Sequence, residues 1–249
     1  MSSRAYPLSI GDPNTRANIL WIHGYSGSPD AFIPIAEKIA TETNALVTLP
    51  LLPGHNTHEQ DLLPYGFDDF LSALHPVAQK LSKTQKPLII IGYSFGSYLA
   101  ACVAEEFNPT ALVFALTPFS LQFPMSLPGT RYAWALKSFW DKRLTKEDIL
   151  EREGTFYYPN VPGTSLELIH EGNMRLKKIL PRLSFPIMTI HNACDPLAAP
   201  QSGAAILALS GKNPANEKVV YPDGRHALFF RPNHDREEQA LLAFLKKNI

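Results

Sequence analysis

The stretch PLIIIGYSFG, residues 87–96, decides the fold. Its first five residues form an unbroken apolar run, which is typical of a strand covered on both faces of a sheet. The pentapeptide that follows has the spacing G-x-S-x-G, and a helical pattern begins at Phe95. A serine between two glycines at a strand-to-helix turn predicts a nucleophile elbow with Ser94 at its tip. We expect Gly92 and Gly96 where this tight turn leaves no room for a side chain.

Runs of the same apolar character recur along the chain, and helical patterns separate most of them. The apolar runs are 17–22, 45–49, 87–91, 110–116, 186–191 and 217–221, and the helical patterns are 30–43, 68–82, 95–107, 201–210 and 234–247. Strands that alternate with helices predict an α/β fold, with a mostly parallel central sheet flanked by helices. In such sheets, functional sites form beyond the carboxyl ends of the strands.

One connection is much longer than a simple crossover requires. About seventy residues separate the run that ends at Leu116 from the run that begins at Pro186. Segment 118–171 within it is dense in aromatic residues and prolines, and we expect a mostly helical insertion laid over the strand ends. The alternative is additional core. This division gives a core of residues 1–117 and 172–249 and a cap of residues 118–171.

A serine hydroxyl is a weak nucleophile and needs a base that is itself held by an acid. On this scaffold the expected order along the chain is serine, acid, histidine. His226 lies beyond the last apolar run, and Asp195 lies four residues beyond the run that ends at His191. Asp223 is the nearest rival to Asp195, but it is only three residues before His226 and is expected to be a turn residue. We therefore predict Ser94, His226 and Asp195 as the catalytic residues.

An acyl-transfer transition state also needs hydrogen-bond donors for its oxyanion. The backbone N–H of Phe95, directly after the nucleophile, is one candidate. The other is the backbone N–H of Tyr25, which follows a strand end and His23-Gly24. Gly24 allows the backbone to approach the site closely.

Five motifs together resemble those of the α/β-hydrolase superfamily. They are His23-Gly24-Tyr25, Pro53-Gly54-His55, the G-x-S-x-G at 92–96, Asp195-Pro196-Leu197 and Gly224-Arg225-His226. The chain is most similar to the bacterial carboxylesterase and monoacylglycerol-lipase-like group, akin to the serine aminopeptidase-like hydrolases. The resemblance covers residues 17–249 and is weaker over the insertion. The resemblance implies a cap after the sixth strand. One departure is Asn56, which follows Pro53-Gly54-His55 where the group commonly has glycine, and we expect a different shape for this loop.

Composition excludes several classes of protein. The 249 residues include 23 basic and 23 acidic side chains, and this balance argues against nucleic acid as a partner. Residues 1–15 lack a signal-peptide pattern, and the longest apolar run has seven residues, so we expect a cytoplasmic protein without a transmembrane segment.

No metal site is expected. A zinc motif would need a different order of residues from that of His55, His58 and Glu59. We therefore assign His55 and His58 hydrogen-bonding roles in their loop.

The sequence thus predicts a serine hydrolase that cleaves carboxylic esters of short- to medium-chain acyl groups through an acyl-enzyme, with no cofactor. Its partner is a small acyl ester, and nothing in the sequence indicates the oligomeric state. The same residues would serve a thioesterase, a C–C hydrolase, a peptidase or an acyltransferase. A hydrolase fold that binds ligands without catalysis is the alternative outside enzymes.

Overall fold

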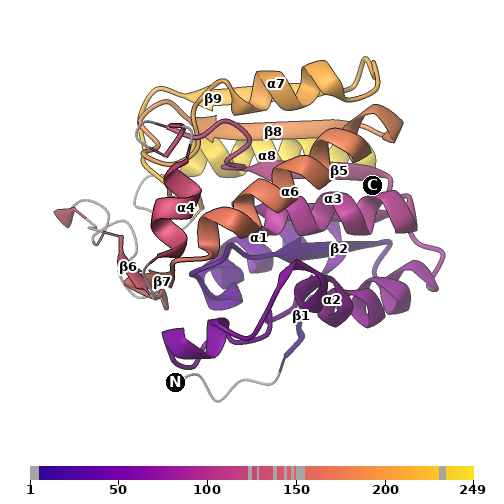
Figure 1. Cartoon of the computed structure of the whole chain (residues 1–249). Helices are drawn as coiled ribbons and strands as arrows, with labels where there is room; N and C mark the ends of the chain where they lie inside the picture. The colour runs from indigo at the N-terminus through magenta and orange to yellow at the C-terminus, as the bar shows by residue number, and fades with distance from the viewer. Residues whose placement is uncertain are drawn as a thin grey trace.

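The computed structural model of the chain describes residues 6–122, 125–127, 129–136, 139–142, 145, 146, 149, 155–229 and 234–249. Seven strands form one sheet in the order β1-β3-β2-β4-β5-β8-β9 (Figure 1). All neighbours are parallel except β1, which runs antiparallel to β3 at one edge. The strands are β1 (Leu8–Ile10), β2 (Ala17–Ile22), β3 (Ala45–Leu49), β4 (Leu88–Tyr93), β5 (Ala111–Ala115), β8 (Ile187–Asn192) and β9 (Glu217–Tyr221).

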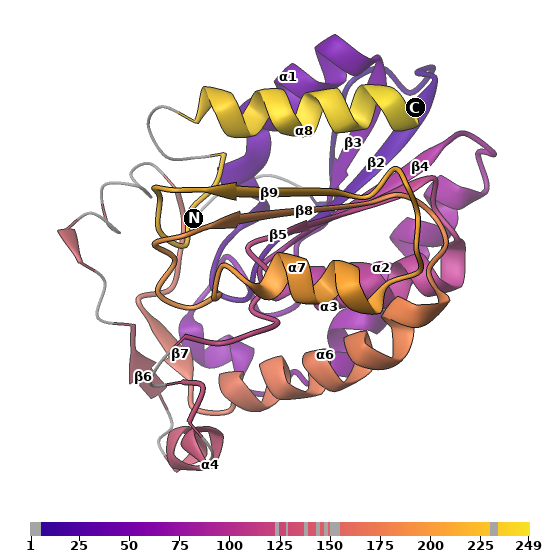
Figure 2. The ribbon, with the colours of Figure 1, turned by 90° about the horizontal axis from the view of Figure 1, so that it is seen from above.

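Helices cover both faces of this sheet. Figure 2 shows α1 and α8 on one face, and α2, α3, α6 and α7 on the other. The helices are α1 (Ile33–Thr43), α2 (Phe67–Ser82), α3 (Gly96–Phe107), α4 (Thr130–Ala135), α6 (Ser165–Ile179), α7 (Ser202–Leu209) and α8 (Asp235–Asn248), with 3-10 turns at Pro29–Phe32, Glu59–Leu62 and Leu180–Arg182.

The central strands bury both of their faces. In β2, Ile19 and Trp21 belong to the core under α1 and α8, whereas Leu20 and Ile22 belong to the core under α2 and α3. This arrangement explains why the strands read as continuous apolar runs without alternation. The predicted α/β fold with a mostly parallel sheet is confirmed, and three of the predicted strands have the predicted bounds.

Segment 118–171 is not simply helical. Its described residues form the short helix α4 and a two-stranded antiparallel ribbon of β6 (Phe139–Asp141) and β7 (Asn160–Pro162). Helix α6 begins at Ser165 and continues past residue 171, so the predicted end of the cap falls inside one helix. Phe123, Pro124 and Pro128, which contributed to the predicted insertion, lie outside the described residues.

Helix α6 packs directly on α3. A Cβ on Gly172 would lie 2.5 Å from Cγ of Tyr98, so a glycine at this position lets α6 lie directly against the Tyr98 side chain of α3. Leu168 and Leu176 of α6 belong to the same buried cluster as residues of α2 and α3, so α6 joins the helical layer of the core. Within the part of the chain that the structure describes, no helix combines the length and apolar character needed to cross a membrane.

Candidate active site

Ser94 sits at the turn between β4 and α3, with a left-handed φ of 52°. This conformation strains a non-glycine residue by roughly 1–3 kcal/mol. A Cβ on Gly92 would lie 2.4 Å from Cα of Ser97, and a Cβ on Gly96 would lie 2.4 Å from the carbonyl oxygens of Ile22 and His23. Both glycines therefore occupy positions where the turn has no room for a side chain.

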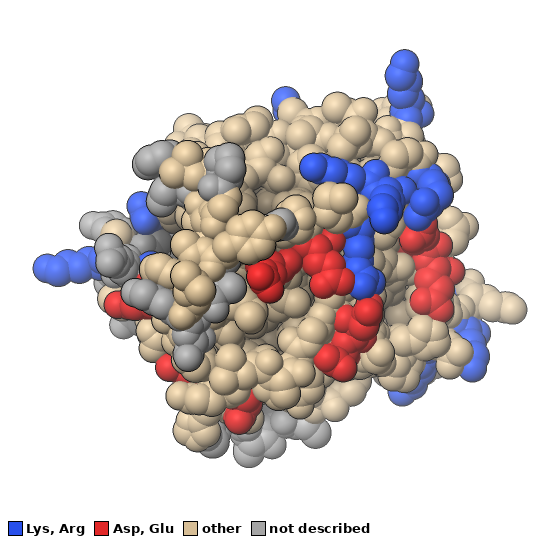
Figure 3. Space-filling view, in the orientation of Figure 1, with Lys and Arg blue, Asp and Glu red and all other residues tan. Residues whose placement is uncertain are grey.

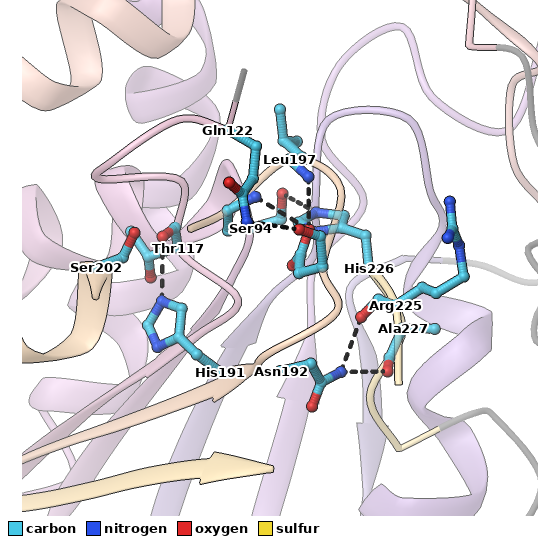
Figure 4. A network of polar contacts seen from close by, with 12 residues as sticks. Ser94, Thr117, Gln122, His191, Asn192, Leu197, Ser202, Arg225, His226 and Ala227 are labelled. Carbon is cyan, nitrogen blue, oxygen red and sulfur yellow. Dashed lines mark hydrogen bonds and ion pairs between the residues drawn. The ribbon is translucent and has the colours of Figure 1, made fainter. Parts of the chain in front are cut away.

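The structure brings three of the predicted side chains together at the carboxyl ends of β4, β8 and β9. Nε2 of His226 lies 2.8 Å from Oγ of Ser94, and Nδ1 of His226 lies 2.6 Å from Oδ2 of Asp195. Figure 4 shows the Ser94 hydroxyl and the His226 ring facing one another. With Asp195 accepting the Nδ1 proton, Nε2 is left to accept the serine proton.

Asp195 is 1% exposed, and hydrogen bonds fix its carboxylate. Oδ1 accepts the backbone N–H groups of Leu197 (2.8 Å) and Ala198 (3.0 Å), which leaves Oδ2 for His226. The Gln122 side chain donates to the Asp195 carbonyl oxygen at 3.3 Å. The bonds to Oδ1 and Oδ2 hold the carboxylate in one orientation, and the bond from Gln122 holds the backbone of Asp195.

The rival acid, Asp223, lies elsewhere. Its side chain is 59% exposed, and its Oδ1 accepts a hydrogen bond from Nη2 of Arg236 at 2.7 Å. The structure thus places Asp195, and not Asp223, beside the ring of His226.

The loop that carries His226 is anchored on both sides of the histidine. The Asn192 side chain donates to the carbonyl oxygens of Arg225 (2.8 Å) and Ala227 (3.2 Å), as Figure 4 shows. The Tyr93 hydroxyl donates to the carbonyl oxygen of His226 at 3.2 Å. Sequence reasoning identified none of Asn192, Gln122 and Tyr93 as supports, because only the folded chain brings them to this loop.

The acid loop, residues 193–199, is attached to the beginning of the insertion. We call residues 118–122 the first arm. The backbone N–H of Ala199 donates to the carbonyl of Ser120 at 2.8 Å, and the N–H of Gln122 donates to the carbonyl of Leu197 at 3.0 Å. The Ser202 hydroxyl accepts the N–H of Ser120 at 3.0 Å. The first arm therefore supports the loop that holds Asp195.

Loop 24–28 lies against the other side of Ser94. A Cβ on Gly24 would lie 3.2 Å from Cβ of Ser94, so glycine permits the close approach. The ring of Tyr25 contacts the ring of Phe95 edge-on, with centroids 5.4 Å apart. Tyr25 and Phe95, whose backbone N–H groups are the predicted oxyanion donors, thus flank the serine from two different loops.

Two buried histidines lie beneath loop 24–28. Nε2 of His23 accepts the N–H of Leu52 at 3.0 Å, so its Nδ1 carries the proton and donates to the Gly24 carbonyl at 2.9 Å. Burial is the main cause that lowers the pKa of His23 well below its ordinary value, and the charge of His55 lowers it further. His23 is therefore neutral near neutral pH.

His55 contacts two carbonyl groups. Its Nδ1 lies 2.9 Å from the oxygen of Pro53, inside its own loop as predicted, and its Nε2 lies 2.5 Å from the oxygen of Tyr25. Burial lowers the pKa of His55, and the carbonyl contacts oppose that effect. Among the described residues, no group of three His, Cys, Asp or Glu side chains could hold a metal ion.

A cavity of about 540 Å³ opens over Ser94 and His226. Most of its wall is apolar and is shared between the core and the insertion. The apolar lining includes Phe32, Met125, Phe156, Val161, Leu166 and Ile169. Lys142 brings a positive charge to the same wall, where its Nζ lies 3.0 Å from Oγ of Ser26.

A second cavity, of about 680 Å³, lies between α2, α3 and α6 and shares no lining residue with the first. On this face acidic and basic side chains gather next to one another (Figure 3). Arg175 pairs with Asp68 and Glu171, and Arg182 pairs with Glu105. His75 also lies 2.8 Å from Oε1 of Glu106, so most of the charged side chains that line this cavity are paired with a neighbour of opposite charge or a hydrogen-bond partner.

Comparison with known proteins places this geometry in a family. The chain matches the model of the alpha/beta hydrolase family over residues 19–238. The chain belongs to this family, and the resemblance seen in its motifs is confirmed at that level.

Individual relatives are lipolytic enzymes. The thermostable monoacylglycerol lipase of Bacillus sp. (strain H-257) is 25% identical over 226 residues, which cover 88% of this chain and 87% of that protein. A solved structure from work on LipS and LipT, two metagenome-derived lipolytic enzymes, has a TM-score of 0.81 at 19% identity, covering 97% of this chain and 98% of that one. The monoacylglycerol lipase of Paleococcus ferrophilus has a TM-score of 0.79 at 13% identity and covers 97% and 98%. The two solved structures share the fold of this chain, and the sequence match to the Bacillus enzyme makes the chain a lipase- or esterase-like alpha/beta hydrolase.

Proposed function

We propose that the protein is a serine esterase that hydrolyses carboxylic esters of short- to medium-chain acyl groups. The observation that supports this proposal most directly is the 2.8 Å approach of Nε2 of His226 to Oγ of Ser94 at the floor of an apolar cavity. A nucleophile paired with a base needs this geometry, and an apolar wall suits an acyl chain.

In the first half of the reaction, Oγ of Ser94 attacks the ester carbonyl carbon while Nε2 of His226 takes the serine proton. Asp195 keeps the imidazole oriented and stabilises its positive charge. The backbone N–H groups of Tyr25 and Phe95 donate to the oxyanion of the tetrahedral intermediate. His226 then returns the proton to the leaving alcohol, and the acyl group remains on Ser94.

In the second half, water replaces the alcohol. His226 removes a proton from a water molecule as its oxygen attacks the acyl carbon, and the same two N–H groups stabilise the second oxyanion. The proton then returns to Oγ of Ser94 and the carboxylic acid leaves. None of these steps requires a metal or an organic cofactor.

The insertion shapes the substrate site in this proposal. Phe156 and Val161 from its later part and Met125 from its earlier part face the same cavity as Ser94. We assign the cap to residues 118–164, which ends before α6, because α6 packs on α3 in the core. Monoacylglycerols are natural candidates within the ester class, since a curated relative and a structural neighbour carry that activity in their names.

A hydrolysis panel tests the proposal. We expect p-nitrophenyl esters of short and medium acyl length and monoacylglycerols to be cleaved faster than acyl thioesters and aminoacyl amides. Ser94→Ala should lower kcat by roughly 10⁶-fold and abolish labelling by a fluorophosphonate probe. Hydrolysis at the parent rate by Ser94→Ala would refute the role of Ser94.

The same panel, extended with added alcohols and a diketone substrate, separates the rival activities. Preferential cleavage of thioesters or aminoacyl amides would indicate a thioesterase or a peptidase, and acyl transfer to added alcohols in preference to water would indicate an acyltransferase. Cleavage of a carbon–carbon bond in a diketone substrate would indicate a C–C hydrolase. Failure of the unchanged protein to react with the fluorophosphonate probe would favour a non-catalytic ligand-binding role.

A further inference from the structure

The later part of the insertion is attached to loop 24–28. We call residues 155–162 the second arm. The backbone N–H of Tyr158 donates to the carbonyl of Ser26 at 2.8 Å, and Tyr157 forms an antiparallel bridge with Gly27. The second arm therefore extends the backbone hydrogen bonding of the loop that carries Tyr25.

The side chain of Tyr158 reaches a different loop. It is 3% exposed, and its hydroxyl donates to the carbonyl of Gly54 at 2.9 Å. The same hydroxyl accepts the backbone N–H of Thr57 at 3.1 Å. These two bonds close loop 54–57 around the tyrosine hydroxyl, with His55 between them.

His55 connects that loop back to Tyr25. Its ring lies 6.2 Å from the ring of Tyr158, and its Nε2 lies 2.5 Å from the Tyr25 carbonyl oxygen. Because His55 is 2% exposed, water does not replace this contact readily. Tyr158 is thus connected to loop 24–28 in two ways. Its backbone N–H bonds directly to Ser26, and its side chain holds the loop of His55, which contacts Tyr25.

From these contacts we infer that Tyr158 is a positioning residue for the oxyanion donor Tyr25. The inference rests on the proposed function, in which the Tyr25 N–H stabilises the tetrahedral intermediate. Such a donor is effective only within about 2.7–3.1 Å of the oxyanion, so a small shift of loop 24–28 weakens transition-state stabilisation. Binding of the ester in its ground state depends on the apolar wall and is affected much less.

The test is Tyr158→Phe, which keeps the buried ring and the backbone bond to Ser26 but removes the hydroxyl. We expect kcat to fall about tenfold while KM changes less than about twofold, with Tm measured in parallel. The matched control is Tyr221→Phe, because the Tyr221 hydroxyl donates to the Arg236 carbonyl at 3.0 Å and holds α8 to β9. This control should lower Tm to a similar extent and leave kcat within about twofold.

An oxyanion-specific readout separates positioning from general loosening. When Oγ of Ser94 adds to a trifluoromethyl ketone, its proton passes to His226 and the ketone oxygen becomes an oxyanion, while no group leaves. The inhibition constant for this adduct should rise about tenfold in Tyr158→Phe, matching the tenfold fall in kcat. An unchanged inhibition constant, or a loss that appears only in KM, would overturn the inference.

A double-mutant cycle tests the route through His55. In a His55→Ala background the further loss from Tyr158→Phe should shrink to less than about twofold, because the connection is already broken. Two independent, multiplying losses would contradict this route.

The proposed function and the positioning role can fail separately. If Ser94→Ala retained full activity, the proposed function itself would fail. If Ser94→Ala is inactive and Tyr158→Phe is fully active, only the positioning role of Tyr158 fails.

Discussion

Gly96 lies so close to the end of β2 that a Cβ at this position would be 2.4 Å from the carbonyl oxygen of His23. The first residue of α3 thus packs against the end of the strand that leads into loop 24–28. Through this contact, the turn that carries Ser94 lies directly beside the chain segment that leads to Tyr25.

We expect Gly96→Ala to break this contact. The added methyl group forces the two backbones apart, so the free energy of unfolding should fall by about 1–3 kcal/mol and kcat should fall with it. Urea unfolding and hydrolysis rates measure the two effects. Gly27→Ala is the stability control, since nothing lies within 4 Å of a Cβ at that position. Equal unfolding free energies for the two variants would contradict the tight packing of Gly96.

A second prediction concerns the two candidate acids. Asp195→Asn should lower kcat by roughly 10⁴-fold, because an amide can donate to Nδ1 of His226 and stabilise the wrong tautomer. Asp223→Asn should leave kcat within about twofold, since its partner is the exposed Arg236. Comparable losses of kcat in both variants, measured on the same p-nitrophenyl ester, would contradict the assignment of Asp195 as the acid that orients His226.

A third prediction concerns pH and the buried histidines. Burial lowers the pKa values of His23 and His55 below the ordinary value of 6.5, so the unfolded chain takes up protons before the folded chain does as pH falls. The free energy of unfolding should therefore decrease below about pH 6.5, by up to about 1.4 kcal/mol per pH unit for each histidine. Urea unfolding between pH 8 and pH 5 measures this slope.

The variant His55→Gln separates the contribution of His55 from that of the other buried histidines. At pH 8 both side chains are neutral, so the difference from the parent protein reports only the lost contacts. Burial also lowers the pKa of His191, so three buried histidines take up protons on unfolding. Below pH 6.5 the variant should lose stability less steeply, because one of these three proton uptakes is gone. Parallel slopes for parent and variant would show that His55 has an ordinary pKa in the folded chain.

A fourth prediction concerns the cysteines. Burial raises the pKa of the Cys102 thiol to about 12, whereas Cys194 is exposed. At pH 8 we expect iodoacetamide to alkylate Cys194 and to leave Cys102 unmodified until the protein is unfolded, because the thiolate is the reactive species. Peptide mass spectrometry distinguishes the two sites. Equal labelling rates in the folded protein would contradict the raised pKa of the Cys102 thiol.

The sequence predicts the central sheet well because burial on both faces leaves a local signal. Strand β4 and the turn at Ser94 lie within one decapeptide whose apolar run and glycine spacing need no distant contact to be recognised. In contrast, β1, β6 and β7 have three residues each, too few to show a period. Their pairing depends on partners elsewhere in the chain.

The same distinction applies to the site. Ser94, Asp195 and His226 each follow a strand, and parallel strands bring their carboxyl ends to one edge, so their meeting could be predicted. The groups that hold them could not. Gln122 reaches Asp195 across 73 positions and Tyr158 reaches Gly54 across 104, and neither has a local motif. Such long-range hydrogen bonds become visible only in the folded chain.

The two arms of the insertion also constrain how the insertion of this protein can be exchanged for that of a relative. The first arm is bonded to the loop of Asp195 and the second arm to the loop of Tyr25. A chimera that receives the cap of a relative would inherit foreign attachments at both loops, even if every core residue stayed the same. Specificity and turnover are therefore expected to change together when caps are swapped, and successful recombination would keep the native sequence at both junctions.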